Sequence, residues 1–358
     1  MTTGRIQGQV KIVGTGLIGT SIGLALSKLG VSVTLEDVSP ANVRLASDYG
    51  AGSKATSADL PELIVVCVPP DVTARVVAAE LSNFPDAVVT DVASVKTSIL
   101  DELAASGADL SRYVGSHPMA GREKGGASSG RADIFVGRPW VIAANPESSP
   151  NAVQLVEQLA LDLQSTPIRM NAQEHDRAVA LVSHTPQVVS SLLAAQLVGS
   201  EGVELAGQGL RDTVRIAASD PKLWVQILGA NSTEVVKVLR GFEADLTKVI
   251  TALENVGETG ALSTIDQTIA NGNRGVEQLP GKHGSKRTNL ETVTVILEDR
   301  PGQLAKFFTE INDIGINAED VKLEHNPGAQ LGMLELSVLP SAVEKLQLEM
   351  TARGWRFA

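Results

Sequence analysis

The sequence predicts an α/β protein whose parallel sheet is followed by an all-helical region and by a small unit of mixed strands and helices. Three observations carry this prediction. β-branched apolar runs alternate with helical patterns over residues 1–170, helical periodicity dominates residues 171–270, and alternating strand patterns return over residues 288–358. Alternation of strands with helices is typical of a parallel sheet with helices on both faces. Residues 271–287 are expected to be a linker.

The first strand, 10–13, ends in a glycine turn with the spacing Gly-x-Gly-x-x-Gly, and a helical pattern follows until Gly30. A second β-branched run, 31–35, ends at Glu36 and Asp37. This is a βαβ unit of the Rossmann type, in which a pyrophosphate sits on the helix N-terminus and an acid binds the adenosine ribose. The expected dinucleotide contacts are Gly14, Thr15, Gly16, Leu17, Ile18, Gly19 and Asp37, with Glu36 as the alternative acid.

The acid at the end of the second strand favours NAD over NADP, because a carboxylate repels the 2′-phosphate of NADP. Arg44 follows soon after and leaves NADP possible. The alternative interpretation of the glycine turn is a tight turn in an α/β protein that binds no nucleotide.

Later strands are predicted at 63–68, 87–90, 113–114, 140–144 and 165–170. Ligands of an open parallel sheet bind beyond the carboxyl ends of its strands. Val68, Pro69, Ser94 and His117 lie at or just after such ends, so we expect them to meet the glycine turn in one crevice, where Val68, Pro69 and Ser94 are further expected cofactor contacts. His117, in an apparently rigid turn, is a candidate proton acceptor near neutral pH. The alternatives are a hydrogen-bonded turn histidine, and for Ser94 the N-cap of a helix that starts at Lys96.

Arg215, in the helical region, lies in an otherwise apolar stretch of small residues. A guanidinium in such surroundings requires an anionic partner, which a substrate carboxylate would supply. The alternative is a structural ion pair with Asp176 or Asp220. The apolar helices around it are expected to pack against each other or against a partner subunit.

The last 70 or so residues show strand, helix, strand, strand, helix and strand patterns in that order. The order βαββαβ is that of a ferredoxin-like unit. Its alternating strands predict one sheet face that is solvated or covered by a partner.

Composition limits the possible partners. A net charge of −11 and a pI near 5.0 argue against binding to nucleic acids or to anionic membranes. The single cysteine, Cys67, lies in an apolar run, so we expect a buried thiol, no disulfide and no metal site, in a reducing cytoplasm. The N-terminus is polar, and no run of the sequence approaches the length expected of a membrane span.

Several motifs in order along the chain resemble those of the bacterial prephenate/arogenate dehydrogenases of tyrosine biosynthesis. They are the glycine turn, Asp91–Lys96, Gly115–Gly121, His175–Arg177, Ser183–Pro186 and Arg211–Ala217. The tail resembles an ACT domain at Asp299–Leu304 and Gly315–Asn317. The resemblance covers essentially the whole chain, and its motifs are jointly specific.

The resemblance implies a homodimeric, NAD-dependent enzyme that oxidatively decarboxylates prephenate to 4-hydroxyphenylpyruvate, or arogenate to tyrosine. By likeness, His117 takes the proton of the ring hydroxyl, Ser94 orients His117 or the hydroxyl, and Arg215 holds a substrate carboxylate. The remaining substrate contacts that the likeness implies are Glu123 across the site mouth, His184 in its wall and Trp224 closing it.

One position departs from the family pattern. Many members that use prephenate have a second histidine where this chain has Gln187. That residue would face the substrate side chain, which carries a keto group in prephenate and an ammonium in arogenate. We therefore expect arogenate to be used, and arogenate specificity is an open alternative.

The ACT resemblance implies tyrosine as a feedback effector, and the alternative is a tail that only strengthens dimerisation. The implied effector contacts are Asp299, Arg300, Pro301, Gly302, Gly315, Ile316 and Asn317. Two rival functions for the whole chain are a β-hydroxyacid dehydrogenase and a non-catalytic sensor of cofactor and amino acid. The first uses a catalytic lysine on its helical domain, where this chain offers Arg215, and the set of Ser94, His117 and Arg215 argues against the second.

Overall fold

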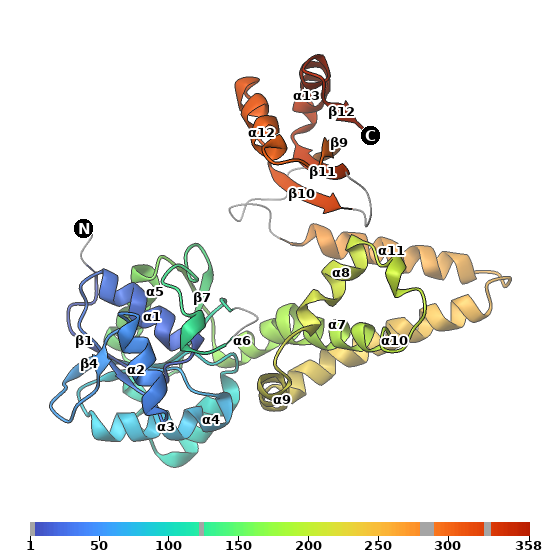
Figure 1. Ribbon diagram of the computed structural model, residues 1–358. Helices are drawn as coiled ribbons and strands as arrows, with labels where there is room; N and C mark the ends of the chain where they lie inside the picture. The colour runs from blue at the N-terminus through green and yellow to red at the C-terminus, as the bar shows by residue number, and fades with distance from the viewer. Residues whose placement is uncertain (1–3, 122–124, 280–289, 326–330) are drawn as a thin grey trace. The chain divides into compact units, whose positions relative to one another are not determined.

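The computed structural model describes residues 4–121, 125–279, 290–325 and 331–358. Glu123 and residues 280–287 of the expected linker lie outside the described residues. The chain forms two compact units, Met1–Glu243 and Ala244–Ala358 (Figure 1). Each unit is described by itself below.

The first unit contains an eight-stranded sheet in the order β3-β2-β1-β4-β5-β6-β7-β8. The strands are β1 Gln9–Val13, β2 Val33–Glu36, β3 Ser53–Lys54, β4 Pro61–Val66, β5 Val88–Asp91, β6 Tyr113–Pro118, β7 Pro139–Ala144 and β8 Thr166–Arg169. Strands β1 to β6 are parallel to one another. This parallel, doubly wound order confirms the predicted Rossmann-type domain.

The expectation of a wholly parallel sheet is wrong for β7 and β8. β7 runs antiparallel to β6, and β8 runs parallel to β7. The described part of the β6–β7 connection contains only one short 3₁₀ helix, η2 Ala127–Ser129, so no crossover helix carries the chain back to the starting edge. His117 consequently lies within strand β6, paired with Val141, rather than in a turn.

Helices cover both faces of this sheet (Figure 1). They are α1 Leu17–Lys28, α2 Pro40–Asp48, α3 Pro70–Asn83, α4 Thr97–Ser106 and α5 Pro150–Asp162. Because side chains alternate across a strand, neighbouring strand residues enter two separate cores. Ile12 and Val65 pack in one, and Val13 and Val66 pack in the other. Each fully buried apolar side chain contributes about 1.5–3 kcal/mol, which holds the strand ends in place.

A helix of two α segments follows the sheet. α6 Ala172–Val179 continues through a π-helical turn, η3 Ala180–His184, into α7 Thr185–Ala195. Pro186 explains the wide turn, because its ring has no N–H and would clash with the carbonyl four residues back. The N–H of Thr185 instead donates to the carbonyl of Ala180, five residues back. Such wide turns occur often at functional sites.

The combined helix Ala172–Ala195 is long and apolar enough to cross a membrane, with a mean hydropathy of 1.3 over its best window. This corrects the expectation that no segment reaches that length. The helix also carries His175, Asp176 and His184, which are buried and hydrogen-bonded to other elements. We therefore interpret it as a core helix of the helical region.

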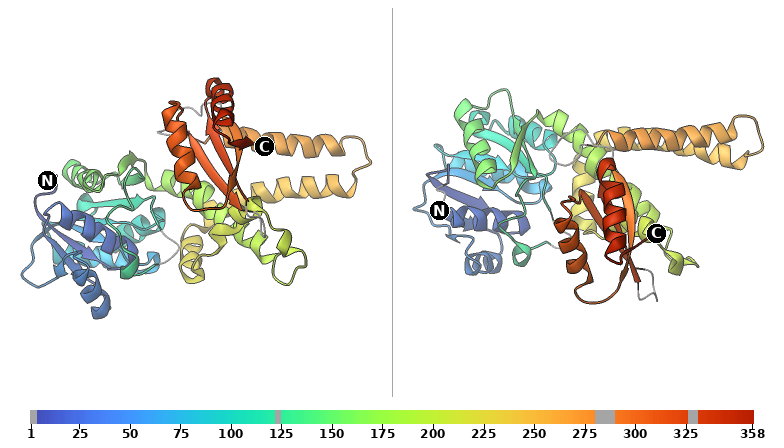
Figure 2. Two further views of the ribbon diagram at one scale, coloured as in Figure 1. Left: turned by 45° about the horizontal axis from the view of Figure 1, so that its top comes forward. Right: turned by 90° about the horizontal axis from the view of Figure 1, so that it is seen from above.

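The rest of the helical region comprises η4 Val203–Leu205, α8 Gln208–Val214, η5 Arg215–Ala217, α9 Pro221–Ala230, α10 Ser232–Glu254 and α11 Ala261–Glu277. α10 and α11 run side by side in opposite directions (Figure 2). Residues 271–277, expected as the beginning of a linker, form the last turns of α11. The helical spacing of apolar residues from Ile265 to Ile269 continues to Val276. The two glycines in between, Gly272 and Gly275, each destabilise the helix by only about 1 kcal/mol relative to alanine, so the helix can continue through them.

The end of the second unit is a four-stranded antiparallel sheet in the order β10-β11-β9-β12. Its elements are β9 Glu291–Glu298, α12 Gln303–Asp313, β10 Asp320–His325, β11 Leu331–Val338, α13 Pro340–Ala352 and β12 Arg356–Phe357. The predicted βαββαβ order is therefore present. Phe307, Leu334, Leu346 and Met350 form its buried core between the sheet and the two helices.

Candidate active site and dinucleotide site

The glycine turn between β1 and α1 leaves room for a ligand at one glycine and none at the other two. A Cβ added to Gly14, whose φ is +100°, would lie 2.4 Å from the carbonyl oxygen of Cys67. A Cβ on Gly19 would lie 1.9 Å from the carbonyl oxygen of Gly14. A Cβ added to Gly16, the N-cap of α1, would have no heavy atom from the surrounding described residues within 4 Å. This open helix N-terminus suits a pyrophosphate.

Asp37 is anchored to the glycine turn. Its Oδ2 accepts hydrogen bonds from the backbone N–H (2.7 Å) and the hydroxyl (3.0 Å) of Thr15, and its Oδ1 accepts from the N–H of Ser39 (2.8 Å). A carboxylate in this position retains acceptor capacity for ribose hydroxyls. The arrangement fits the adenosine end of NAD.

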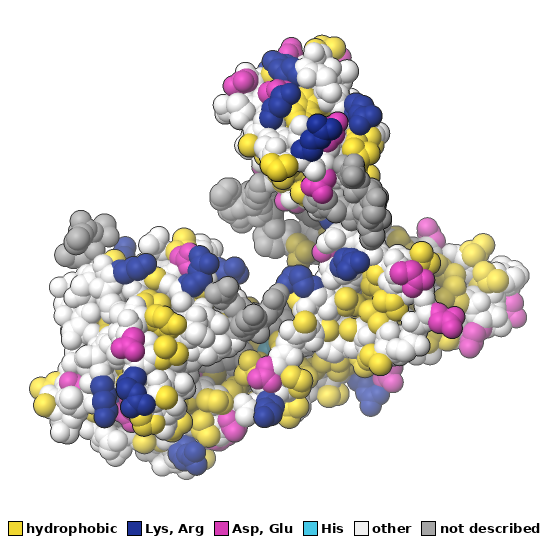
Figure 3. Space-filling model, in the orientation of Figure 1, with side chains coloured by type: hydrophobic (Ala, Val, Ile, Leu, Met, Phe, Trp, Pro, Cys, Tyr) yellow, Lys and Arg dark blue, Asp and Glu magenta, His cyan; other side chains and the backbone are white. Residues whose placement is uncertain are grey.

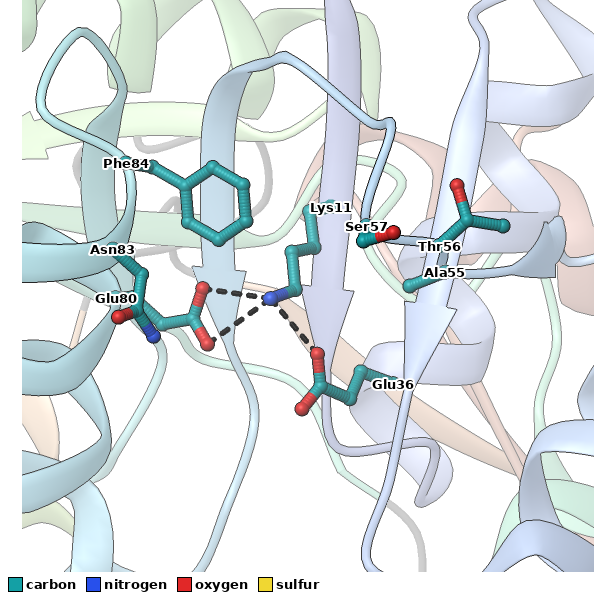
Figure 4. Close-up of a pocket in the computed structure, with 8 residues that line it drawn as sticks. All are labelled: Lys11, Glu36, Ala55, Thr56, Ser57, Glu80, Asn83 and Phe84. Atoms are coloured by element: carbon teal, nitrogen blue, oxygen red, sulfur yellow. Dashed lines mark hydrogen bonds and ion pairs between the residues drawn. The ribbon is translucent and has the colours of Figure 1, made fainter.

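Glu36, the alternative ribose ligand, is engaged elsewhere (Figure 4). The buried ammonium of Lys11 lies 2.8 Å from a carboxylate oxygen of Glu36 and 2.8 Å from one of Glu80. Burial lowers the pKa of Lys11, but the two carboxylates raise it more, so its pKa is above the usual value. This ion pair lines a hollow of about 350 Å³ and leaves Asp37 as the favoured ribose ligand.

The end of β4 lies against the glycine turn. A side-chain methyl of Val68 would lie 3.2 Å from a Cβ on Gly14, and Pro69 is the N-cap of α3. Cys67 precedes them and is only partly buried, rather than fully buried as expected. Desolvation still raises the pKa of its thiol, so the group stays protonated.

The candidate base, His117, is one end of a chain of three side chains. Its Nδ1 lies 2.8 Å from Nε2 of His175, and Nδ1 of His175 lies 2.8 Å from Oδ1 of Asp176. His117 comes from β6, whereas His175 and Asp176 come from α6. The sheet and the helical region thus both contribute to the site.

Asp176 also caps helix α4. Its two carboxylate oxygens accept hydrogen bonds from the backbone N–H groups of Lys96 (2.9 Å) and Thr97 (2.8 Å). The N-cap of α4 is Lys96, and its side chain makes no cap, so the alternative that Ser94 caps this helix is wrong. A carboxylate at a helix N-terminus is also stabilised by the helix dipole.

A buried ion pair lies in the segment that leads into α4. The ammonium of Lys96 pairs with Asp91, whose other oxygen accepts a hydrogen bond from the hydroxyl of Tyr113 (2.7 Å). Lys96 and Asp91 are at most 1% exposed. Removing one member would leave the other charge buried without a partner, which typically costs about 3–5 kcal/mol. The pair therefore fixes the backbone that carries Ser94.

The surroundings of the histidines favour their neutral forms. Burial lowers the pKa of His117 well below its usual value, and the neighbouring His175, Lys96 and His184 lower it further. Burial also lowers the pKa of His175, although Asp176 opposes this shift, and lowers the pKa of His184 to about 4. His117 is thus an unprotonated base at neutral pH.

His184 and Trp224 lie together. The two rings meet edge to face with centroids 6.0 Å apart. The side-chain amide of Asn231 donates to Nδ1 of His184 (3.1 Å) and to the backbone carbonyl of Asp176 (2.8 Å). This buried bridge ties the wall residue His184 to the helix that carries the histidine chain.

Gln187 is buried, and its amide is held by two hydroxyls. Its Nε2 donates to Ser191 (3.2 Å), and its Oε1 accepts from Ser219 (3.3 Å). Ser219 follows η5, the short 3₁₀ helix that begins with Arg215 and packs on α7. Gln187 is therefore close to the segment that carries the candidate substrate arginine.

Arg215 is exposed at the junction of α8 and η5. Of the two acids considered as its structural partners, Asp176 accepts hydrogen bonds from His175 and from the N-terminus of α4, and Asp220 caps α9. Within the described residues, Ser94 is partly buried and makes no hydrogen bond to His117, whose Nδ1 is directed to His175 instead. The expected role of Ser94 in orienting His117 is not what the geometry shows.

The sequence interpretation missed several members of this site. Lys96, Asp91, Tyr113 and Asn231 were not assigned roles, and His175-Asp176 was recognised only as a motif. A lysine two residues after a serine, just beyond a strand end, is the sequence signal available for Lys96. Nothing in the local pattern signals Asn231. Within the described residues, no group of three or more His, Cys, Asp or Glu side chains could hold a metal ion.

The fold and the site define an NAD-binding dehydrogenase with a candidate histidine base, and comparison with known proteins agrees on the class. The family model "Prephenate dehydrogenase, nucleotide-binding domain" matches residues 22–168, and "Prephenate dehydrogenase, dimerization domain" matches residues 171–265. The chain belongs to the prephenate dehydrogenase family. The predicted class, an NAD-dependent oxidoreductase, is thereby confirmed, and the β-hydroxyacid dehydrogenase and non-catalytic sensor alternatives are not supported.

Three relatives illustrate the similarity. The chain is 34% identical to a probable prephenate dehydrogenase, NovF, of Streptomyces niveus, over 96% of this chain and 98% of that protein. The crystal structure of Synechocystis arogenate dehydrogenase is 26% identical, with a TM-score of 0.62, over 75% of this chain and 99% of that one. Prephenate dehydrogenase from A. aeolicus, solved with hydroxyphenyl propionate and NAD+, shares the fold at 24% identity, with a TM-score of 0.67 over 75% and 98%.

Two glycine substitutions should separate cofactor binding from stability. Gly19→Ala should destabilise the fold by about 1–3 kcal/mol, because its methyl would overlap the Gly14 carbonyl. Gly16→Ala should leave the melting temperature near that of the unmodified protein and weaken NAD binding about tenfold or more, since its methyl enters the open space at the helix N-terminus. Thermal melting and calorimetric titration with NAD measure both effects. Unchanged NAD affinity in Gly16→Ala would contradict the assignment of the turn.

Proposed function

We propose that the protein catalyses NAD-dependent oxidative decarboxylation of prephenate, arogenate or both, as a step of tyrosine biosynthesis. The observation that carries the proposal is a neutral, partly buried histidine at the C-terminal end of a strand in a dinucleotide-binding sheet, with its Nδ1 already engaged. Membership of the prephenate dehydrogenase family supports the choice of substrate.

The reaction needs a proton acceptor and an oxidant at the same ring carbon. NAD+, when bound, takes the hydride from the carbon that bears the hydroxyl. His117 accepts the hydroxyl proton as the carbon–oxygen bond gains double-bond character. The bond to the ring carboxylate then breaks to release CO₂, and its electron pair completes the aromatic ring. The proton returns to the phenol oxygen, so no net proton is released.

The other residues hold the substrate for this step. Arg215 binds a substrate carboxylate bidentately, which gives an acidic chain a local site for an anion. His184 and Trp224 form the wall and the closing surface. Ser94 contacts the ring hydroxyl rather than His117, and Glu123, which lies outside the described residues, is proposed to pair across the mouth.

Gln187 is proposed to favour arogenate. Its amide can accept a hydrogen bond from the ammonium of arogenate, whereas a histidine in its place would suit the keto group of prephenate. The hydroxyls of Ser191 and Ser219 already hold this amide, so the group is preorganised for a charged partner. The similarity to an arogenate dehydrogenase of known structure agrees with this choice.

A homodimer is proposed through the helical region. Apolar side chains gather over its surface (Figure 3), and those exposed on α10 and α11 include Val236, Phe242, Leu246, Ile250, Leu253, Leu262 and Ile269. Each of these side chains is at least 44% exposed, and groups of exposed apolar side chains mark sites of association. The match of residues 171–265 to a dimerization domain supports the same conclusion.

The βαββαβ tail is proposed to be an ACT domain that binds tyrosine. The proposed site comprises the turn before α12, where Gly302 has a φ of +88°, and the turn after it, where Gly315 has a φ of +69°. We also propose the domain boundaries 1–170, 171–277 and 288–358, with 278–287 joining the last two, and a cytoplasmic location consistent with the free thiol of Cys67.

Loss of the base should remove catalysis and spare cofactor binding. We expect His117→Asn to lower kcat by about 10²–10⁴-fold, because the ring hydroxyl loses its proton acceptor. NAD affinity and melting temperature should change little, since His117 is not among the nucleotide contacts. Steady-state assays with both substrates and a calorimetric NAD titration check this. Turnover within threefold of the unmodified protein would remove His117 from the role.

Substitution of the selecting residue should change the preferred substrate. Gln187→His should raise the ratio of kcat/KM for prephenate to kcat/KM for arogenate about tenfold or more, equivalent to roughly 1.4 kcal/mol. The matched control is Gln196→His, the same change at an exposed position at the end of α7. If both variants keep the ratio of the unmodified protein, Gln187 does not select the substrate.

Tyrosine should inhibit the full chain and raise its melting temperature. Binding to the folded state stabilises it by about 2.7 kcal/mol at a hundredfold excess over Kd. Asn317→Ala should weaken both responses, and phenylalanine serves as the ligand control. Identical kinetics and melting curves across a tyrosine titration would favour a tail that serves only dimerisation.

A further inference from the structure

We propose that His175 and Asp176 are positioning residues that set the tautomer of His117, so that its Nε2 is the atom that accepts the substrate proton. The inference deepens the proposed function and rests on it for the identity of the substrate. It is carried by the unbroken contact from Asp176 through His175 to His117 and by the backbone groups that hold Asp176.

The first step concerns the state of Asp176. The backbone N–H groups of Lys96 and Thr97 can only donate, so both carboxylate oxygens act as acceptors. Burial raises the pKa of Asp176, but hydrogen bonds from His175 and Thr97 lower it more, and the net shift is downward. Asp176 is therefore an anion, and Nδ1 of His175 must carry the hydrogen that this anion accepts.

The second step passes the constraint to His117. His175 is neutral because its pKa is lowered, so a proton on Nδ1 leaves a lone pair on Nε2. That lone pair faces Nδ1 of His117 at 2.8 Å, and only a hydrogen on His117 Nδ1 makes this contact attractive. The lone pair of His117 is then on Nε2, the ring atom that does not face His175. In the opposite tautomer two lone pairs would face each other.

The third step concerns the charge that develops when His117 takes the proton. The groups that act on His117 are His175 from α6, Lys96 at the start of α4 and His184 from the π-helical turn, and its neighbour His175 is in turn acted on by Asp176 and by Asp91 from β5. Lys96 opposes the new positive charge but is paired with Asp91. Asp176, held one imidazole away, is the anion that stabilises the imidazolium.

Asp176 also has a structural role as the cap of α4, so the test must separate positioning from stability. Asp176→Asn keeps the shape and one acceptor oxygen but removes the charge that fixes the tautomer of His175. The matched control is Asp162→Asn, because Asp162 is another buried carboxylate that accepts backbone N–H groups, from Arg5 and Ile6, and touches no histidine.

In the full-length protein we expect Asp176→Asn to lower kcat by about 10²–10⁴-fold with NAD affinity retained. Asp162→Asn should stay within threefold of the unmodified protein at a similar loss of melting temperature. The acid limb of the kcat profile should move to lower pH in Asp176→Asn, because removing a nearby negative charge lowers the pKa of His117. Asp176→Glu should recover part of the rate. Equal rates in the two Asn variants, or an unmoved acid limb, would overturn the proposal.

A second readout depends neither on turnover nor on a variant of Asp176. ¹⁵N-histidine NMR of the unmodified protein should show His117 and His175 as neutral Nδ1–H tautomers, with His117 identified by its absence in His117→Asn. An Nε2–H tautomer at His117 would overturn the proposal that His175 and Asp176 set its tautomer. If the expected tautomers are present while neither prephenate nor arogenate is oxidised, the proposed substrates are wrong, whereas the positioning role of His175 and Asp176 is retained.

Discussion

The carboxylate of Asp176 is the contact on which the geometry of the site depends. It accepts hydrogen bonds from the first N–H groups of α4 and from His175, and so joins the parallel sheet domain to the first helix of the helical region. A buried anion with fewer partners would carry an unfavourable desolvation cost, so the two elements have one favourable relative position. Because His175 is adjacent in the chain and His117 is on β6, the same constraint orients the base.

A buried charge pair between Lys96 and Asp91 stabilises the segment whose backbone donates to Asp176. The segment from Asp91 to Lys96 begins at the end of β5 and ends at the N-terminus of α4, and its two charged side chains pair with each other inside the protein. Tyr113, at the beginning of β6, adds a hydrogen bond to Asp91. The strand that carries His117, the loop that carries Ser94 and the helix capped by Asp176 are thus parts of one polar network. Such a network is rigid when every member is satisfied.

Local signals made the dinucleotide half of this structure predictable, whereas contacts between distant residues did not follow from them. The β1–α1–β2 unit is defined by period, glycine spacing and an acid, all within 37 residues, and the structure has it. β7 is antiparallel to β6 because the described part of their connection contains no crossover helix, and the residue pattern alone does not indicate this. The contact between His117 and His175 spans 58 positions and two elements. The sequence shows the motifs that contain His117 and His175, but it does not show that the two side chains are in contact.

In the proposed mechanism, the residues that orient the base and those that contact the substrate lie on one helix. His175 and Asp176 precede the π-helical turn, and His184 and Gln187 lie in or after it. Asn231 bridges the two parts by donating to the carbonyl of Asp176 and to His184. Since Pro186 favours the wide turn, this residue sets the spacing between the two groups. If Gln187 selects the substrate as proposed, its substitution leaves Pro186 and the turn in place, so His175 and Asp176 keep their positions and the orientation of His117 is retained.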